Sequence, residues 1–223
     1  MATIPLSSTV EDYLKQLYLL GQDRPVQTQA LADVLSVAPA SVTGMLRKLT
    51  EQGLITYTPY RGARLTPRGS KIALEVLRHH RLLELYLHEA LGLPLDQVHD
   101  EAERLEHVLS DALEARMAAW LGNPAFDPHG DPIPSVDGAV PHRDERSFTS
   151  LLPGARTQIV RVPGGAEVLS ALLAHGLVPG VMVTYLARDL ALGTVTIQVE
   201  RQPPIVVAAS VAAQLWVAEP VHA

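Results

Sequence analysis

Histidine and glutamate residues recur three and four positions apart in the middle of the chain. His80 is followed by Glu84, and the run HDEAERLEH over residues 99–107 repeats the pattern. An α-helix brings residues three and four apart onto one face, so each group predicts a stripe of imidazole nitrogens and carboxylate oxygens. Such a mixed set suits divalent first-row metals, and carboxylate-rich sets favour Mn(II) or Fe(II). The predicted ligands are His80, Glu84, His99, Glu103, Glu106 and His107, with Asp12 far upstream.

The alternative for HDEAERLEH is a solvated acidic helix face, which is the usual explanation of a charge run. This alternative suits Glu101 and Arg104. It suits two histidines and two glutamates on one stripe poorly, because the preceding helix offers its own His/Glu pair. The residues alone therefore favour a metal site.

Composition limits the class of protein. With 223 residues and 47% hydrophobic content, the chain can form one large domain or a few small ones. It has no cysteines, which excludes a disulfide scaffold and a zinc finger. The N-terminus lacks the features of a signal peptide, and no apolar stretch reaches membrane-spanning length. We expect a cytoplasmic globular protein without a membrane partner.

Charge is distributed unevenly along the chain. Residues 1–71 hold 8 Lys+Arg against 5 Asp+Glu, residues 72–145 hold 5 against 15, and residues 146–223 hold 5 against 4. A basic first segment attracts the phosphate backbone of nucleic acid even when the whole chain carries a net charge of −6. The first segment is therefore the candidate for DNA binding.

The first segment has the pattern of a winged helix-turn-helix. Ser8 and Glu11 match a capping box, which predicts that a helix begins at Ser8 with Asp12 in its first turn. Two further short helices are predicted over residues 26–37 and 38–55, and alternating residues then predict two strands around Tyr60-Arg61-Gly62. Similar patterns occur in proteins that do not bind DNA, but the excess of Lys and Arg favours DNA.

The helix predicted over residues 38–55 is the expected recognition helix. Its apolar positions Val42, Leu46 and Leu49 should pack inward, which leaves small, hydroxyl and basic residues for a DNA groove. The predicted DNA-contacting residues, including two arginines of the wing, are Pro39, Ala40, Ser41, Thr43, Arg47, Arg61 and Arg64, with Gly44 on the same face.

The middle and last segments differ in character. Two long helices, over about 67–88 and about 95–120, carry more apolar residues than one helix pair needs, which suggests a homodimer and hence a palindromic DNA site. Residues 122–153 are rich in Pro and Gly and predict a linker. The last segment predicts short strands and one helix over 166–177, as in a small SH3-like barrel. Glu167 is a weak candidate for a ligand donated by this segment.

Several motifs jointly resemble the diphtheria-toxin-repressor family of iron- and manganese-dependent transcriptional regulators, over essentially the whole length. They are TVEDYLKQLYLL, PASVTGMLRKLTEQGLI, YRGARLTPRG, HHRLLELYL, VHDEAERLEHVLSD, PHGDPIP and HGLVPG. The resemblance implies a mainly α protein with a β C-terminal domain. Its domains would be a winged helix-turn-helix (1–74), a helical metal-binding and dimerisation domain with the linker (75–145) and an SH3-like domain of the ferrous-transport-associated type (146–223).

The resemblance also implies two metal sites. The primary site would be Asp12, Glu103, Glu106 and His107, and the ancillary site would be His80, Glu84 and His99, with help from the barrel. Iron-type members have methionine and cysteine at the positions of Asp12 and Glu103, so the carboxylates here favour Mn(II) over Fe(II). Small manganese regulators have a further glutamate where this chain has Lys15, which argues against a close pair of manganese ions.

The implied function is a Mn(II)-responsive, non-enzymatic repressor of metal-uptake genes, in which a metal joins Asp12 to Glu103, Glu106 and His107. Zn(II), Co(II) or Cd(II) are expected to substitute in vitro, because Mn(II) and Fe(II) stand low in the affinity order of divalent metals. Three alternatives stay open: an Fe(II)-responsive regulator, a winged-helix regulator of a small organic ligand, and a metal-dependent hydrolase.

Overall fold

The computed structural model describes residues 6–21, 24–163, 166–200 and 202–220. The chain falls into two compact units. The first unit contains residues 1–80, 103–114 and 134–140, and the second contains residues 81–102, 115–133 and 141–223.

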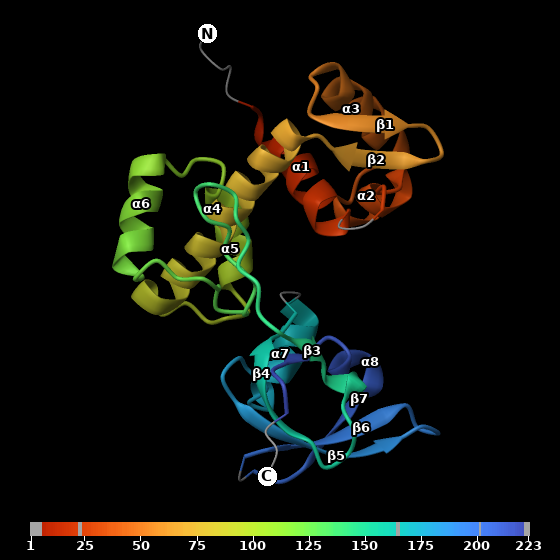
Figure 1. Ribbon diagram of the computed structural model, residues 1–223, viewed down its shortest axis with the longest axis vertical. Helices are drawn as coiled ribbons and strands as arrows, with labels where there is room; N and C mark the ends of the chain where they lie inside the picture. The colour runs from red at the N-terminus through yellow and green to blue at the C-terminus, as the bar shows by residue number, and fades with distance from the viewer. Residues whose placement is uncertain (1–5, 22–23, 164–165, 201, 221–223) are drawn as a thin grey trace. The chain divides into compact units, whose positions relative to one another are not determined.

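The first unit contains a winged helix-turn-helix (Figure 1). Helices α1 (Ser8–Leu20), α2 (Thr28–Val34) and α3 (Pro39–Glu51) precede the hairpin of β1 (Ile55–Thr58) and β2 (Gly62–Leu65). The bend between α2 and α3 is 111°. Apolar faces of all three helices meet in one core, to which α1 contributes Val10, Leu14 and Leu17 and α3 contributes Leu46 and Leu49. The recognition helix therefore shares one hydrophobic core with α1.

The capping box predicted at the start of α1 is wrong. Ser7, and not Ser8, is the N-cap, and its side chain makes no capping hydrogen bond. The Glu11 carboxylate instead accepts a hydrogen bond from His107 Nδ1 at 2.6 Å. Glu11 therefore pairs with His107, which is far away in the sequence, and not with Ser8.

The hairpin is held against the rest of the domain at a glycine. Gly62 has φ +94°, and a Cβ built there would lie 2.6 Å from the carbonyl oxygen of Val26. This close approach allows Val26 and Ala63 to exchange two backbone hydrogen bonds, of 2.8 and 2.9 Å. Glycine is required both by its left-handed conformation and by the lack of space.

We expect Gly62→Ala to lower the stability of the protein by about 1–3 kcal/mol, because it adds backbone strain and a steric clash. The matched control is Gly44→Ala in α3, where an added Cβ meets nothing within 4 Å. This second change should be neutral or stabilising by up to about 1 kcal/mol, since alanine favours a helix. Thermal unfolding followed by circular dichroism measures both; equal melting temperatures for the two variants would contradict the prediction.

The helix predicted over about 95–120 is two helices. Helix α5 (Val98–Leu105) ends before Glu106, and α6 (Asp111–Trp120) begins after Ser110. Ser110 caps α6, since its carbonyl oxygen accepts hydrogen bonds from the backbone N–H groups of Leu113 and Glu114, both at 2.9 Å. Glu106 and His107 therefore lie in a turn and not on the helical stripe of His99 and Glu103. The preceding helix, α4 (Pro67–Leu91), agrees with its prediction and continues three residues further.

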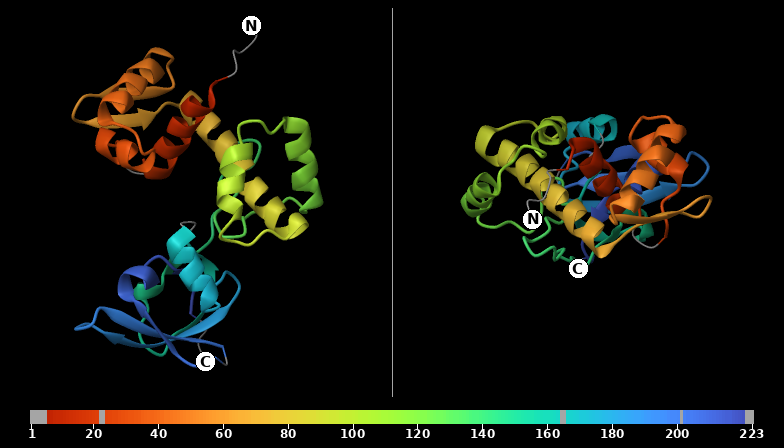
Figure 2. Two further views of the ribbon diagram at one scale, coloured as in Figure 1. Left: turned by 180° about the vertical axis from the view of Figure 1, so that it is seen from behind. Right: turned by 90° about the horizontal axis from the view of Figure 1, so that it is seen from above.

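The C-terminal part of the second unit is a small barrel-like β domain. Its six-stranded sheet has the order β3-β8-β4-β5-β6-β7, and its strand pairs are antiparallel. Figure 2 shows this sheet curling beside α7. The strands and helices are β3 (Arg146–Ser147), η1 (Phe148–Ser150), β4 (Arg156–Arg161), α7 (Ala166–Ala174), β5 (Met182–Asp189), β6 (Thr194–Val199), β7 (Ile205–Ala208), α8 (Ala209–Ala212) and β8 (Trp216–Val217).

Two stretches of the predicted linker, around residues 129–130 and 143, are bonded to this domain. The Val162 N–H donates to the carbonyl oxygen of His129 at 2.9 Å. The Arg143 guanidinium donates to the carbonyl oxygens of Gly130 and Val160, at 2.8 and 2.9 Å. The side chain of Leu95, which precedes α5, lies in the barrel core. The predicted fold class, a mainly α protein with a C-terminal SH3-like β domain, is confirmed.

Among the described residues, no single helix is both long and apolar enough to cross a membrane. Only α2 and α3 taken together, across their bend, pass that test by length and composition.

Candidate metal centres and DNA interface

Three of the predicted ligands meet in the first unit. Asp12 in α1, Glu106 and His107 each place one ligand atom within 4.8 Å of the others. His107 Nε2 lies 2.9 Å from Asp12 Oδ1 and 3.4 Å from Glu106 Oε1. This cluster, the first centre, joins α1 to the turn that follows α5.

The orientation of His107 suits a metal ligand. Its Nδ1–H donates to Glu11 Oε2 at 2.6 Å, which leaves the lone pair of Nε2 directed towards Asp12 and Glu106. A carboxylate that holds the second ring nitrogen is the usual support of a histidine that binds metal. Glu11 was missed as a site residue because its spacing from Ser8 suggested a local role.

Asp12 provides a test of whether a cation fits. Among the described residues, its Oδ1 atom is one of two buried side-chain polar atoms without a hydrogen-bond partner. Burial raises the pKa of the Asp12 carboxyl above its usual value, against the opposing charges of His107 and Lys15. An imidazole lone pair and an unsatisfied carboxylate oxygen that face each other need a positive charge between them, so the residues fit a divalent cation.

Lys15 and His80 surround Glu106. The Lys15 ammonium donates to Glu103 Oε1 and to Glu106 Oε1, both at 2.6 Å. Lys15 itself is only 2% exposed. His80 Nδ1 donates to Glu106 Oε2 at 2.6 Å. Burial alone would raise the pKa of Glu106, but His80 and Lys15 outweigh it and hold that pKa below its usual value. Burial likewise opposes the ammonium, yet the two glutamates raise the pKa of Lys15.

A second cluster lies in the second unit. Glu84 in α4, Asp127 and His129 are all buried, and each places one ligand atom within 4.8 Å of the others. Glu84 uses its two oxygens differently: Oε1 accepts a hydrogen bond from His99 Nδ1 at 3.0 Å, and Oε2 lies 3.6 Å from His129 Nδ1. We call Glu84, Asp127 and His129 the second centre.

The second centre also has acceptors that face one another. His129 Nε2–H donates to the carbonyl oxygen of Leu95 at 3.1 Å, so the neutral ring directs its Nδ1 lone pair at Glu84. Burial, with the charges of Glu84 and Asp131, raises the pKa of Asp127 to about 8. Burial opposes a charged imidazole, but the hydrogen bond and charge of Glu84 raise the pKa of His129. The cluster is built for a positive charge, whether a proton or a metal ion.

The sequence prediction missed Asp127 and His129. Both lie in an irregular segment, where Asp127 Oδ1 accepts hydrogen bonds from the backbone N–H groups of His129 and Asp131, both at 2.9 Å. The motif PHGDPIP, which contains His129 and directly follows Asp127, was the available signal, but it was taken as part of a linker. The side chain of Glu167 lies outside the described residues, so its suggested role stays a prediction.

The predicted DNA face is open to solvent. On α3, Pro39, Ala40, Ser41, Gly44 and Arg47 are exposed and Thr43 is half-buried. Arg61 and Arg64 on the hairpin are exposed as well, and Gln27 donates a hydrogen bond of 3.3 Å to the carbonyl oxygen of Arg61. Small residues and cations on one helix and its wing suit a duplex.

A winged helix-turn-helix with a partly buried carboxylate–histidine cluster beside it defines the class, a metal-dependent DNA-binding repressor. Three family models match: the N-terminal DNA-binding domain of iron-dependent repressors over residues 5–63, their metal-binding and dimerisation domain over 66–135, and the FeoA domain over 147–219. The chain belongs to the iron-dependent repressor family, whose members are transcriptional repressors and not enzymes.

Relatives and solved structures agree with this assignment. The iron-dependent repressor IdeR of Mycobacterium bovis is 32% identical over 193 residues, which cover 80% of this chain and 84% of the relative. The diphtheria toxin repressor of Corynebacterium efficiens is 36% identical over 169 residues, 74% of each chain. A structure titled a manganese-dependent transcriptional repressor in complex with manganese has a TM-score of 0.88 and 34% identity, covering 95% of this chain and 100% of its own.

Proposed function

We propose that this protein is a cytoplasmic, Mn(II)-responsive repressor of metal-uptake genes that binds a palindromic operator as a homodimer. The observation that carries the proposal is the first centre, in which Asp12 of the DNA-binding domain meets Glu106 and His107 of the dimerisation domain. Its donor set has carboxylates and imidazole and no sulfur, which favours Mn(II) over softer ions. Fe(II) is the alternative effector.

The residues explain how metal would control DNA binding. A divalent ion at the first centre would supply a bond between α1 and the turn after α5. Because α1 shares its core with α3, fixing Asp12 also fixes the recognition helix. Metal and DNA then favour the same arrangement, and each must tighten the binding of the other by the same factor, commonly about 5–150-fold.

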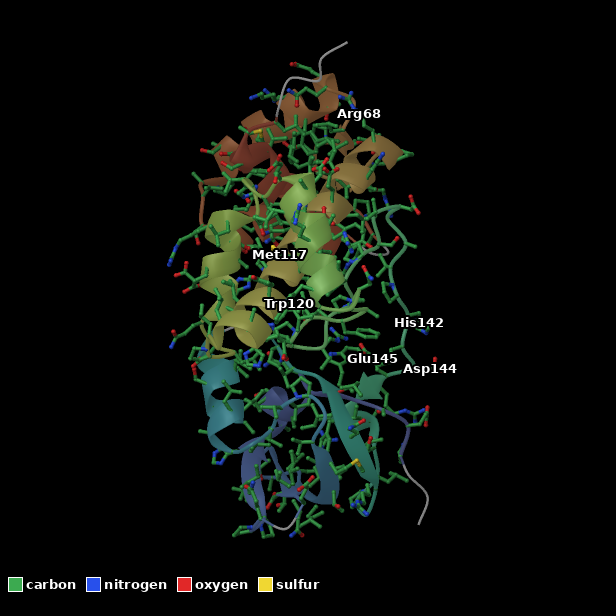
Figure 3. All side chains as sticks on the ribbon, turned by 90° about the vertical axis from the view of Figure 1, so that its left-hand side faces the viewer. Arg68, Met117, Trp120, His142, Asp144 and Glu145 are labelled. Carbon is green, nitrogen blue, oxygen red and sulfur yellow. The ribbon has the colours of Figure 1, made fainter. Side chains whose placement is uncertain are left out.

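Dimerisation has candidate surface residues. In the first unit, Val108 after α5 and Leu113 in α6 are 77% and 50% exposed. In the second unit, Trp120, labelled in Figure 3, is exposed. It packs edge-on against Tyr86, with ring centroids 5.5 Å apart. Exposed apolar residues of this size are typical of a subunit interface. A two-fold dimer presents two recognition helices and so favours a palindromic operator.

The second centre is proposed as a further metal site, with Glu84, Asp127 and His129 as ligands and His99 supporting Glu84. It shares Glu84 with the ancillary set expected from the resemblance and adds two residues of the predicted linker. The roles expected for His80 and His99 stay predictions. Its proposed role is structural, because His129 makes hydrogen bonds to two parts of the unit. Its carbonyl oxygen accepts from Val162, just after β4, and its ring donates to the carbonyl oxygen of Leu95, before α5.

We expect His129→Asn to reduce the bound Mn(II) by one ion per protomer, because an asparagine cannot direct a nitrogen lone pair at Glu84. The control is His142→Asn, since in the part of the chain that the structure describes His142 pairs only with Asp144, at 3.4 Å, and both side chains are about nine-tenths exposed. Figure 3 labels both residues. Metal content after gel filtration, measured by mass spectrometry, gives the count. An unchanged count in His129→Asn would mean that His129 carries a proton in place of a metal.

The proposed function is tested by fluorescence anisotropy with a labelled duplex from the upstream region of the gene, titrated with Mn(II), Fe(II) and Zn(II) and then with chelator. Binding that appears with micromolar Mn(II) and disappears with chelator supports the proposal. A response to Fe(II) and not to Mn(II) would assign the alternative effector. Binding that ignores all metals and the chelator would overturn the proposal and favour a small organic ligand.

A further inference from the structure

Lys15 occupies an unusual position for a lysine. Its side chain is buried, and its ammonium lies 2.6 Å from an oxygen of each of two proposed metal ligands, Glu103 and Glu106. The two ion pairs give the buried ammonium an anionic partner on each side. A cation of the protein's own is therefore part of the first centre.

Lys15 already occupies the carboxylate oxygens that a second divalent ion would need. Its ammonium lies 2.6 Å from Glu103 Oε1 and 2.6 Å from Glu106 Oε1. A second divalent ion that bridged these two carboxylates would have to displace the ammonium. A buried ammonium separated from its partners is costly, so the centre has room for one divalent ion.

Lys15 also competes with an incoming ion. Glu106 Oε2 is held by His80, and Glu106 Oε1 is held by Lys15, although Oε1 is the oxygen that lies 3.4 Å from His107 Nε2. An ion between Asp12 and His107 must therefore share this oxygen with the ammonium or displace it. Two cations that share one carboxylate repel each other more strongly in a buried site than in water.

We propose that Lys15 is a resident cation of the first centre, which limits the centre to one divalent ion and raises the metal concentration at which it fills. This inference rests on the proposed function, because it concerns the regulation of the same site. It makes Lys15 a positioning and tuning residue and not a ligand. A residue of α1 thereby sets the Mn(II) concentration at which repression begins.

The test is direct titration of the full-length protein with Mn(II), following free Mn(II) by electron paramagnetic resonance. Lys15→Gln keeps a hydrogen-bond donor but removes the charge, and it should bind the first Mn(II) at least tenfold more tightly than the wild type. Lys15→Arg restores the charge and should return the affinity towards the wild-type value. The control is Arg116→Gln, which removes one exposed positive charge from α6 and should leave the affinity within about twofold. Equal or weaker binding by Lys15→Gln would overturn the inference.

A second measurement needs no substitution at Lys15 and covers the case in which Lys15→Gln fails to fold. Two Mn(II) ions that share carboxylates are exchange-coupled, and their spectrum differs from the six lines of an isolated ion. Wild-type protein saturated with Mn(II) should show isolated ions only, and a coupled pair would contradict the inference. If the wild type showed no Mn(II)-dependent DNA binding, that result would count against the proposed function alone. The titration and the spectrum both report bound metal and not DNA binding.

Discussion

Asp12→Ala should abolish metal-dependent DNA binding and leave the homodimer intact. The substitution removes the ligand that α1 contributes, while Glu106, His107 and the exposed apolar residues beyond α5 remain. Because the Asp12 Oδ1 atom has no hydrogen-bond partner among the described residues, its removal should cost little stability. Coupling of metal to DNA would be lost, so affinity should fall to the metal-free level, a loss of about 5–150-fold.

Asp33→Ala is the matched control, since Asp33 is an exposed acid of the same domain, on α2. Within the described ranges, its side chain accepts a hydrogen bond only from Gln29, four residues away on the same helix. Anisotropy with and without Mn(II) measures DNA binding, and sedimentation velocity measures the dimer. Metal-dependent binding that survives in Asp12→Ala would remove Asp12 from the proposed site. A monomeric Asp12→Ala would show instead that the residue supports the interface.

Glu106→Gln should lower stability more than any other single change discussed. Glu106 is fully buried and bonds to both Lys15 and His80, so its neutralisation leaves the Lys15 ammonium buried beside one remaining, partly exposed partner. Breaking one partner of a buried ion pair costs about 3–5 kcal/mol. The same variant should lose Mn(II) binding at the first centre, since a neutral amide replaces the carboxylate whose Oε1 lies 3.4 Å from His107 Nε2.

Urea unfolding in metal-free buffer, followed by circular dichroism, measures this loss. Glu103→Gln provides the comparison, because Lys15 also pairs with Glu103, whose side chain is 38% exposed. Its stability loss should be clearly smaller, since a partly solvated pair contributes only about 0–1 kcal/mol. Similar unfolding midpoints for the two variants would show that burial of Glu106 does not control stability here.

The sequence predicted those parts of the site that depend on local periodicity. The spacing of His99 and Glu103 follows α5, and the pairing of Glu84 with His99 joins two predicted helices. Glu106 and His107 lie close to Asp12 in the structure, although they belong to a turn and not to the helix, and their role as metal ligands stays a prediction. The domain order and the winged helix-turn-helix were predictable because apolar spacing and turn residues recur at short range.

The remaining features depend on tertiary contacts. Glu11 has a plausible local partner in Ser8, and only the folded chain brings it to His107. His129 is oriented by the carbonyl oxygen of Leu95, which is 34 residues away. Such a contact cannot be predicted from a residue pattern. Every residue has a backbone carbonyl, so the residue type does not show which carbonyl will be the partner. The role of Lys15 likewise appears only when Glu103 and Glu106 stand beside it.

Leu95 links two parts of the second unit that the sequence keeps far apart. Its side chain is packed into the hydrophobic core of the barrel, and its carbonyl oxygen holds the ring of His129. The barrel also supports the His129 backbone through Val162. The C-terminal domain is therefore needed to hold the second centre in place. A shorter chain without this domain would lose the contacts that position His129. We expect that relatives that have lost the C-terminal domain in evolution have also lost the second centre.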